Sequence, residues 1–99
     1  MHPSPSTGRI VHYRLSAEDL TRVHEYANRP THNPPVEFAE HRVGDVLPAI
    51  VVRAEGNTVN LHVFLDGPGT LWLPNREHGH EPGHWHWPPI APATAAARH

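Results

Sequence analysis

Apolar and polar residues alternate along two stretches of the chain, and this alternation predicts β-strands. Successive side chains of a strand point to opposite faces of a sheet, so apolar residues at every second position form one buried face. Residues 9–14 and 58–66 show this pattern. The apolar positions that share a face are Val11, Tyr13 and Leu15 near the start, and Val59, Leu61, Val63 and Leu65 further on.

Apolar runs and turn signals predict three further strands. Residues 46–53 are almost continuously apolar and rich in β-branched side chains, and a Glu-Gly-Asn turn follows at 55–57. The Asp-Gly-Pro-Gly sequence at 66–69 is typical of a tight turn and leads into a strand at 70–73. A short last strand is expected at 84–87, where two prolines follow and end it.

A helix is predicted at about residues 17–28. Ser16 and Asp19 fit a capping pattern, in which the Ser16 hydroxyl accepts from the backbone N–H of Asp19 and the Asp19 carboxylate accepts from the N–H of Ser16. Pro30 ends the helix, because the residue before a proline is disfavoured in helical geometry. The expected inward face consists of Leu20, Val23, His24 and Ala27.

These elements predict a single mainly β (α+β) domain at residues 9–89. We expect a small SH3-like antiparallel barrel or meander of about five strands with one short N-terminal helix; closing the sheet would remove exposed strand edges. Residues 1–8 and 90–99 are rich in proline, serine or alanine and are expected to be flexible arms. The connection at 29–43 is expected to be a long loop.

The composition argues against several classes of protein. Without cysteine the chain forms no disulfide and no thiolate metal site. Its eight basic residues, all arginine, and ten acidic residues give a net charge of −2, which argues against nucleic acid as a partner. Apolar runs stay well short of the roughly 18 residues of a membrane span, and residues 1–8 lack the apolar run of a signal peptide. We therefore expect a protein that is neither secreted nor in a membrane.

The sequence contains no familiar catalytic pattern, and we predict that the protein is not an enzyme. Its serines are Ser4, Ser6 and Ser16, two in the predicted arm and one in the helix cap, so a credible serine nucleophile is lacking. Gly67 and Gly69 fall in a hairpin turn and do not precede a helix, so they do not form a phosphate loop.

Eleven histidines are many for this length, and four of them lie within nine residues: His78, His80, His84 and His86. Neutral imidazole binds zinc, nickel or copper, and an H-x-H pair on a strand points both rings to one face. Histidines nevertheless recur along the whole chain, which favours polar side chains that face solvent. We predict no resident metal or cofactor and keep zinc at these four histidines as the alternative.

Aromatic residues supply the candidates for protein contact. Trp72, Trp85 and Trp87 lie within sixteen residues, and we expect at least two of them in the core. Aromatic side chains also dominate the binding energy of many protein interfaces. The interface candidates are Trp85, Trp87, Phe38 and Tyr26.

Five segments form a recognisable pattern: Val11–Ser16, Gly44–Arg53, Val59–Gly67, Leu71–Trp72 and Pro82–Pro88. They contain the strings G-D-x-x-P-A, V-N-L-x-V-F-L-D-G and W-H-W-P. In these segments the chain resembles a family of small proteins encoded by bacteriophages of actinobacteria. The resemblance spans residues 11–88, implies a viral source and leaves the activity open. The chain departs from the family pattern by a longer connection at 29–40 and by extra histidines at His78 and His80.

The resemblance and the lack of a catalytic pattern lead to one favoured function and two alternatives. We expect a non-enzymatic bacteriophage accessory protein that acts by protein contact, as a virion component such as a capsid decoration, minor capsid or head–tail protein. Its partners would be phage structural proteins or copies of itself, and its location the virion or the host cytoplasm. The first alternative is an early phage protein that binds a host or defence factor, and the second is a histidine-rich metal-binding module.

Overall fold

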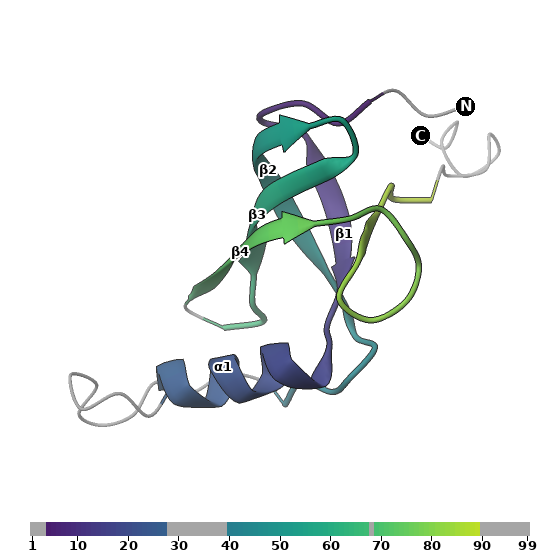
Figure 1. Ribbon diagram of the computed structural model, residues 1–99. Helices are drawn as coiled ribbons and strands as arrows, with labels where there is room; N and C mark the ends of the chain where they lie inside the picture. Colours follow the sequence, from purple (N-terminus) through teal and green to yellow (C-terminus); the bar gives the residue numbers. More distant parts are fainter. Residues whose placement is uncertain (1–3, 28–39, 68, 90–99) are drawn as a thin grey trace, which may run out of the picture.

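The computed structural model describes residues 4–27, 40–67 and 69–89 of the chain, and it consists of one curled antiparallel sheet and one helix (Figure 1). The sheet has five strands in the order β4-β3-β2-β1-β5, so the expectation of a mainly β fold with about five strands and one short helix is confirmed. The elements are β1 (Ile10–Arg14), α1 (Ala17–Ala27), β2 (Val46–Glu55), β3 (Thr58–Phe64), β4 (Thr70–Arg76) and β5 (Trp85–His86).

The long strand β2 joins the two parts of the sheet. Residues 46–50 pair with β1, and residues 49–55 pair with β3, so the two partners overlap only at the centre of β2. The register with β3 shifts between Val51 and Arg53, which marks a β-bulge. Bulges increase the local twist of a strand, and this twist helps the sheet to curl (Figure 1).

The chain that follows β4 returns along the free side of β5 and partly closes the sheet. The backbone N–H of Trp85 donates to the carbonyl oxygen of Glu77 at 3.2 Å, and Gly79 donates to the carbonyl of Trp85 at 2.9 Å. β5 therefore has β1 on one side and the start of the 77–84 connection on the other. These bonds bring the two ends of the strand order together, as expected for a partly closed barrel.

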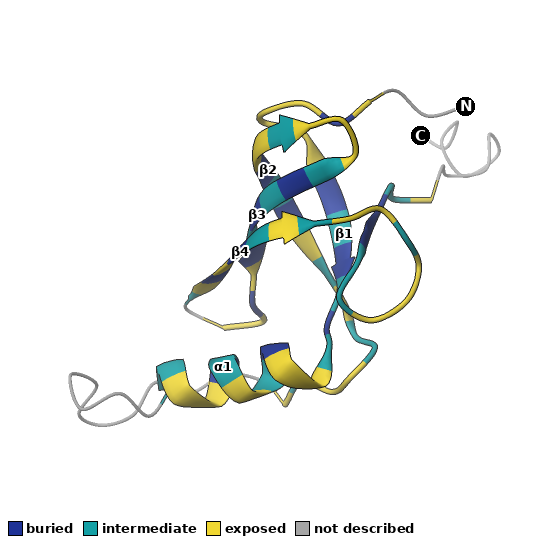
Figure 2. Ribbon diagram, in the orientation of Figure 1, coloured by how far each residue is buried: buried dark blue, intermediate teal, exposed yellow. Residues whose placement is uncertain are grey.

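The core lies inside the curled sheet, and α1 covers one of its ends (Figure 2). The alternating apolar residues predicted from the first and third strands are all buried, which confirms the sequence pattern. Burial removes their apolar surface from water and is the main source of stability for a domain of this size. The buried apolar residues are Val11, Tyr13, Leu15, Val23, Ala49, Val51, Val59, Leu61, Val63, Leu65, Leu71, Leu73 and Trp85.

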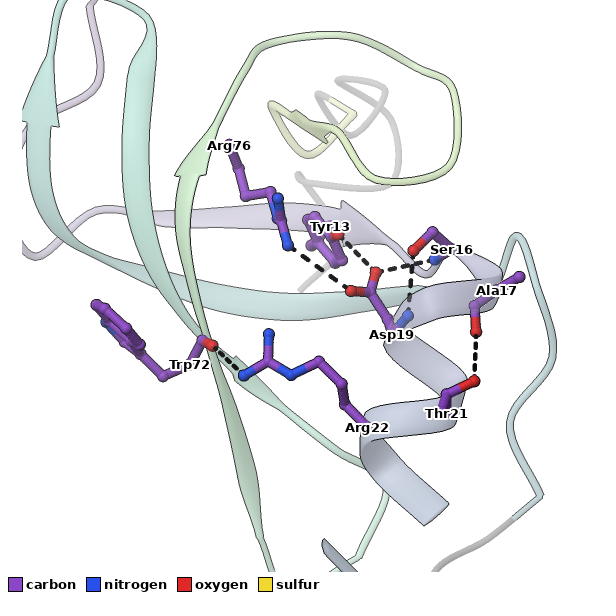
Figure 3. Close-up of polar contacts among 8 residues, drawn as sticks. All are labelled: Tyr13, Ser16, Ala17, Asp19, Thr21, Arg22, Trp72 and Arg76. Atoms are coloured by element: carbon purple, nitrogen blue, oxygen red, sulfur yellow. Dashed lines mark hydrogen bonds and ion pairs between the residues drawn. The ribbon is translucent and has the colours of Figure 1, made fainter. Parts of the chain in front are cut away.

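The helix begins with the predicted cap. The backbone N–H of Asp19 donates to Ser16 Oγ at 3.2 Å, and the N–H of Ser16 donates to Asp19 Oδ2 at 2.9 Å (Figure 3). Of the predicted inward face, Val23 is buried and Leu20 packs against the core, but His24 is exposed. The buried polar position of the helix is Asp19 instead, because its carboxylate points into the sheet.

Asp19 is completely buried, and its carboxylate ties the helix to two strands. Tyr13 Oη on β1 donates to Asp19 Oδ2 at 2.6 Å, and the Arg76 guanidinium at the end of β4 lies 3.9 Å from Asp19 Oδ1 (Figure 3). A buried charge is tolerated only when hydrogen bonds and an opposite charge compensate for its lost hydration. Burial of the Tyr13 hydroxyl raises the pKa of Tyr13 well above its ordinary value. The hydrogen bond to Asp19 and the negative charge of Asp19 raise it further.

The described part of the predicted N-terminal arm contacts the sheet. Gly8 donates its backbone N–H to the carbonyl of Val51 at 2.8 Å, and Thr7 Oγ1 donates to the carbonyl of Val52 at 3.3 Å. Pro5 is buried. These contacts are with β2, far away in sequence, so the composition of the arm alone did not indicate them.

Several sequence predictions concern residues outside the described ranges. These are Phe38, residues 29–39 of the expected connection, residues 1–3 of the N-terminal arm and the tail at 90–99. Within the described ranges, α1 is too short and too polar to cross a membrane.

Replacing Tyr13 by phenylalanine is expected to destabilise the fold by about 1–3 kcal/mol, because the buried Asp19 carboxylate would lose a short, charge-assisted hydrogen bond. Urea denaturation measures the loss. The control is Thr21→Ala, which removes an exposed hydroxyl from the same helix and should change the stability by about 0.5 kcal/mol or less. Equal stabilities of Tyr13→Phe and the parent protein would contradict the role assigned to this bond.

The raised pKa of Tyr13 also predicts a loss of stability in alkali. The folded state holds the Tyr13 proton more tightly than the unfolded state, so the stabilising contribution is complete below about pH 10 and is lost as the pH rises through the folded pKa. Lysines are absent from the sequence, so they do not titrate in this range. The free energy of unfolding above about pH 10 should fall more steeply for the parent protein than for Tyr13→Phe. Parallel curves would count against the assignment.

Candidate functional site: an outer apolar row and a histidine cluster

The outer face of the sheet carries a row of side chains that crosses four strands. Ile10 on β1 pairs with Ile50 on β2, Ile50 pairs with His62 on β3, and His62 pairs with Trp72 on β4. Residues directly opposite each other on neighbouring strands point to the same face and lie about 5 Å apart. We call Ile10, Ile50, His62 and Trp72 the outer row.

The two ends of the outer row are well exposed. Ile10 is 50% exposed and Trp72 is 47% exposed, whereas Ile50 and His62 between them are half-buried. Phe64, two residues from His62 on the same face of β3, is 43% exposed and extends the apolar surface. Clustered exposed apolar side chains, rimmed by polar ones, are typical of contact sites for other proteins.

The backbone of Trp72 is anchored while its indole stays on the surface. Arg22 of α1 donates from Nη2 to the carbonyl oxygen of Trp72 at 3.2 Å, and the indole points away from the helix (Figure 3). A tryptophan on a fixed backbone loses little conformational freedom when a partner covers it, so most of its buried area contributes to binding.

The interface candidates within the described residues, Trp85, Trp87 and Tyr26, lie outside the outer row. Trp85 is only 1% exposed and its indole N–H donates to the carbonyl of Asn57 at 2.9 Å, so its assignment as an interface side chain is corrected: it is a core residue. Trp87 is partly buried, with its ring 5.5 Å from that of Trp85 and the Arg9 guanidinium 5.5 Å from its centre. Tyr26 is half-buried on α1.

Trp72 and Phe64 are exposed aromatic residues that the interface candidates did not include. The signal was present in the sequence, because Trp72 lies between Leu71 and Leu73 and must point away from the face that those two residues share. The alignment of Trp72 with Ile10 depends on the registers of three strand pairs and was not accessible from the sequence. Of the three tryptophans, Trp85 is fully in the core and Trp87 packs against it in part.

A histidine cluster lies beside β5 and comprises His12, His78, His80 and His86. The centre of the His86 ring is 5.0 Å from that of His80 and 5.7 Å from that of His12, and the rings of His78 and His80 are 6.1 Å apart. His78 also packs edge-on against Trp85 at 4.8 Å. The structure thus brings His12, which the sequence pattern did not include, to three of the four predicted histidines.

His86 is buried, so the expectation that these histidines face solvent is wrong for this residue, whereas His78 and His80 are exposed. Only 7% of His86 is exposed, and Nδ1 has no hydrogen-bond partner among the described residues. Burial lowers the pKa of His86, and His80, His12, Arg14 and His78 lower it further, in that order. The ring is therefore held in its neutral form to a lower pH than an ordinary histidine.

The remaining predicted metal candidate, His84, lies next to Gly79 of the connection. Together with His78, His80 and Glu81 it lines a shallow hollow of about 350 Å³. A side chain added at Gly79 would come within 3.0 Å of the His84 ring, so the two pack tightly. Among residues 4–27, 40–67 and 69–89, the structure contains no group of three or more metal-ligating side chains that could hold an ion.

Comparison of this chain with models of protein families, with curated proteins and with solved structures finds no match. The outer row and the histidine cluster are therefore the two features of the chain that bear on its function. The outer row offers exposed apolar side chains to a macromolecule, because Ile10 and Trp72 at its ends are about half exposed.

The tryptophans should respond differently to truncation. We expect Trp85→Ala to cost about 3–5 kcal/mol, because it opens a cavity and removes the bond to Asn57, and Trp72→Ala to cost about 1 kcal/mol or less. Thermal and urea unfolding of both variants measure this difference. Equal losses of stability would contradict the placement of Trp72 on the outer face.

Proposed function

We propose that this chain is a non-enzymatic bacteriophage accessory protein that acts by protein contact, with the outer row as its contact surface. The favoured form is a virion component: a capsid decoration, minor capsid or head–tail protein. The observation that carries the proposal is the alignment of Ile10, Ile50, His62 and Trp72 across four strands.

The physical case for contact rests on the composition and rigidity of this surface. Trp72, Phe64 and Ile10 expose apolar area that water solvates at a cost, so covering them with a partner is favourable. They stand on paired strands, which hold them in place before binding and reduce the entropy lost on association. Tryptophan at the end of such a row is the residue type that most often dominates an interface.

The viral part of the proposal rests on the sequence resemblance. The segments that carry it include Gly44–Arg53 and Val59–Gly67, which contain most of β2 and β3, the two central strands beneath the outer row. The same surface would also suit an early phage protein that binds a host or defence factor. The experiment below separates the two forms.

Mass spectrometry of purified phage particles that carry this gene tests the virion form directly. A fixed ratio of this chain to the major capsid protein is the expected result. Absence of the chain from intact particles, combined with its presence in infected cells, would overturn the virion form and leave the host-directed one.

The contact surface is tested with the same particles. We expect Trp72→Ala to reduce incorporation strongly, because loss of an aromatic contact of about 2 kcal/mol weakens binding about 30-fold. The matched control is Val43→Ala, which removes a side chain that is 52% exposed but lies outside the strands. Both variants should unfold at temperatures close to that of the parent protein. Equal incorporation of the two variants would argue that contact occurs elsewhere.

A further inference from the structure

β5 is the shortest strand of the sheet, and the histidine cluster lies against it. β5 pairs with β1 through only two residue pairs, His12 with His86 and Tyr13 with Trp85. Backbone bonds from Arg14 to His84 at 3.1 Å and from Gly83 to Arg14 at 2.7 Å extend this contact. On its other side, β5 is held by the two bonds to Glu77 and Gly79 described above. β5 is thus paired with its neighbouring strand through fewer residue pairs than any other strand of the sheet, and weakly paired segments open most readily.

The groups that face His86 are basic on both sides. From β1 come His12 and Arg14, and from the 77–84 connection come His78 and His80. The carboxylates of that connection are Glu77 and Glu81; Glu81 lines the hollow next to His80. Neither is among the groups that act on His86, all of which disfavour its charged form. Protonation of His86 therefore places a positive charge in a buried position that basic groups face from both sides.

We propose that the histidine cluster is an acid-sensitive latch: when the buried His86 ring takes up a proton, its poor hydration and the basic groups that face it release β5 and the 77–84 connection from β1, while the β2–β3–β4 meander stays folded. Release would bring Trp85, now in the core, into contact with water. The meander is the firmer part, because β2 pairs with β3 over six residue pairs and β3 with β4 over five.

The direction of the pH effect follows from the lowered pKa of His86. In the released state His86 is hydrated and its pKa returns to near 6.5, so the released state binds a proton more readily than the closed state does. The closed state is therefore favoured above about pH 6.5 and loses stability as the pH falls toward the lowered pKa of His86. If release takes up one proton, its equilibrium constant rises about tenfold for each unit that the pH falls within this window.

The indole N–H of Trp85 reports on the latch, because it donates to the carbonyl of Asn57 only while β5 is in place. We would follow this signal and the backbone amides of Trp85, Leu61 and Val63 by NMR of the full chain between about pH 7.5 and about pH 5. The Trp85 signals should shift and lose protection from hydrogen exchange, after correction for the intrinsic pH dependence, while Leu61 and Val63 in β3 stay protected.

His80→Gln is the main test variant, since His80 is exposed and its replacement should not disturb folding. Removing this neighbour of His86 should move release to lower pH and make the transition shallower. The control is His24→Gln, an exposed histidine on α1, which should release β5 like the parent protein. His86→Gln should abolish most of the transition if it folds; if it does not, His80→Gln decides.

Three results would overturn the latch. The first is a Trp85 indole signal that does not change across the pH range. The second is the same transition in His80→Gln and His24→Gln, which would show that the cluster does not control it. The third is simultaneous loss of protection in β3 and β5, which would mean global acid unfolding and not release of one strand.

Discussion

The arrangement of the domain depends on the interactions of one buried group, the carboxylate of Asp19. It accepts hydrogen bonds from the Tyr13 hydroxyl and from the N–H of Ser16, and it faces Arg76, so one group joins β1, the helix cap and the end of β4. A carboxylate without these partners would be too costly to bury. The same group therefore fixes the direction in which α1 leaves β1 and the end of the sheet that α1 covers.

Much of this fold could be predicted because its signals are local. Alternation identified the buried faces of β1 and β3, and the capping pattern identified the first turn of α1. The strand ends were less accurate: β2 continues to Glu55 and β4 to Arg76, beyond the predicted ends at 53 and 73. The capping pattern also named Asp19, but its burial depends on Arg76, which is brought there only by the folded sheet.

The candidate site was harder to predict, because strand pairing, and not local sequence, brings its residues together. Local alternation places Trp72 on the outside, yet its alignment with Ile10 results from three successive strand registers. The H-x-H pattern indicated that His84 and His86 act together. In the structure His86 instead joins His12 and His80 from other segments, because β5 lies beside β1 and the 77–84 connection returns along it.

Two residues of β1 connect the outer row with the histidine cluster. Ile10 and His12 are next to each other on the same face of β1, the first at one end of the outer row and the second in contact with His86. The proposed partner would cover Ile10, and a proton on His86 would act on His12, two residues further along the same strand. Thermodynamic linkage makes such effects reciprocal. If acid lowers the affinity for a partner, then binding of the partner makes His86 harder to protonate.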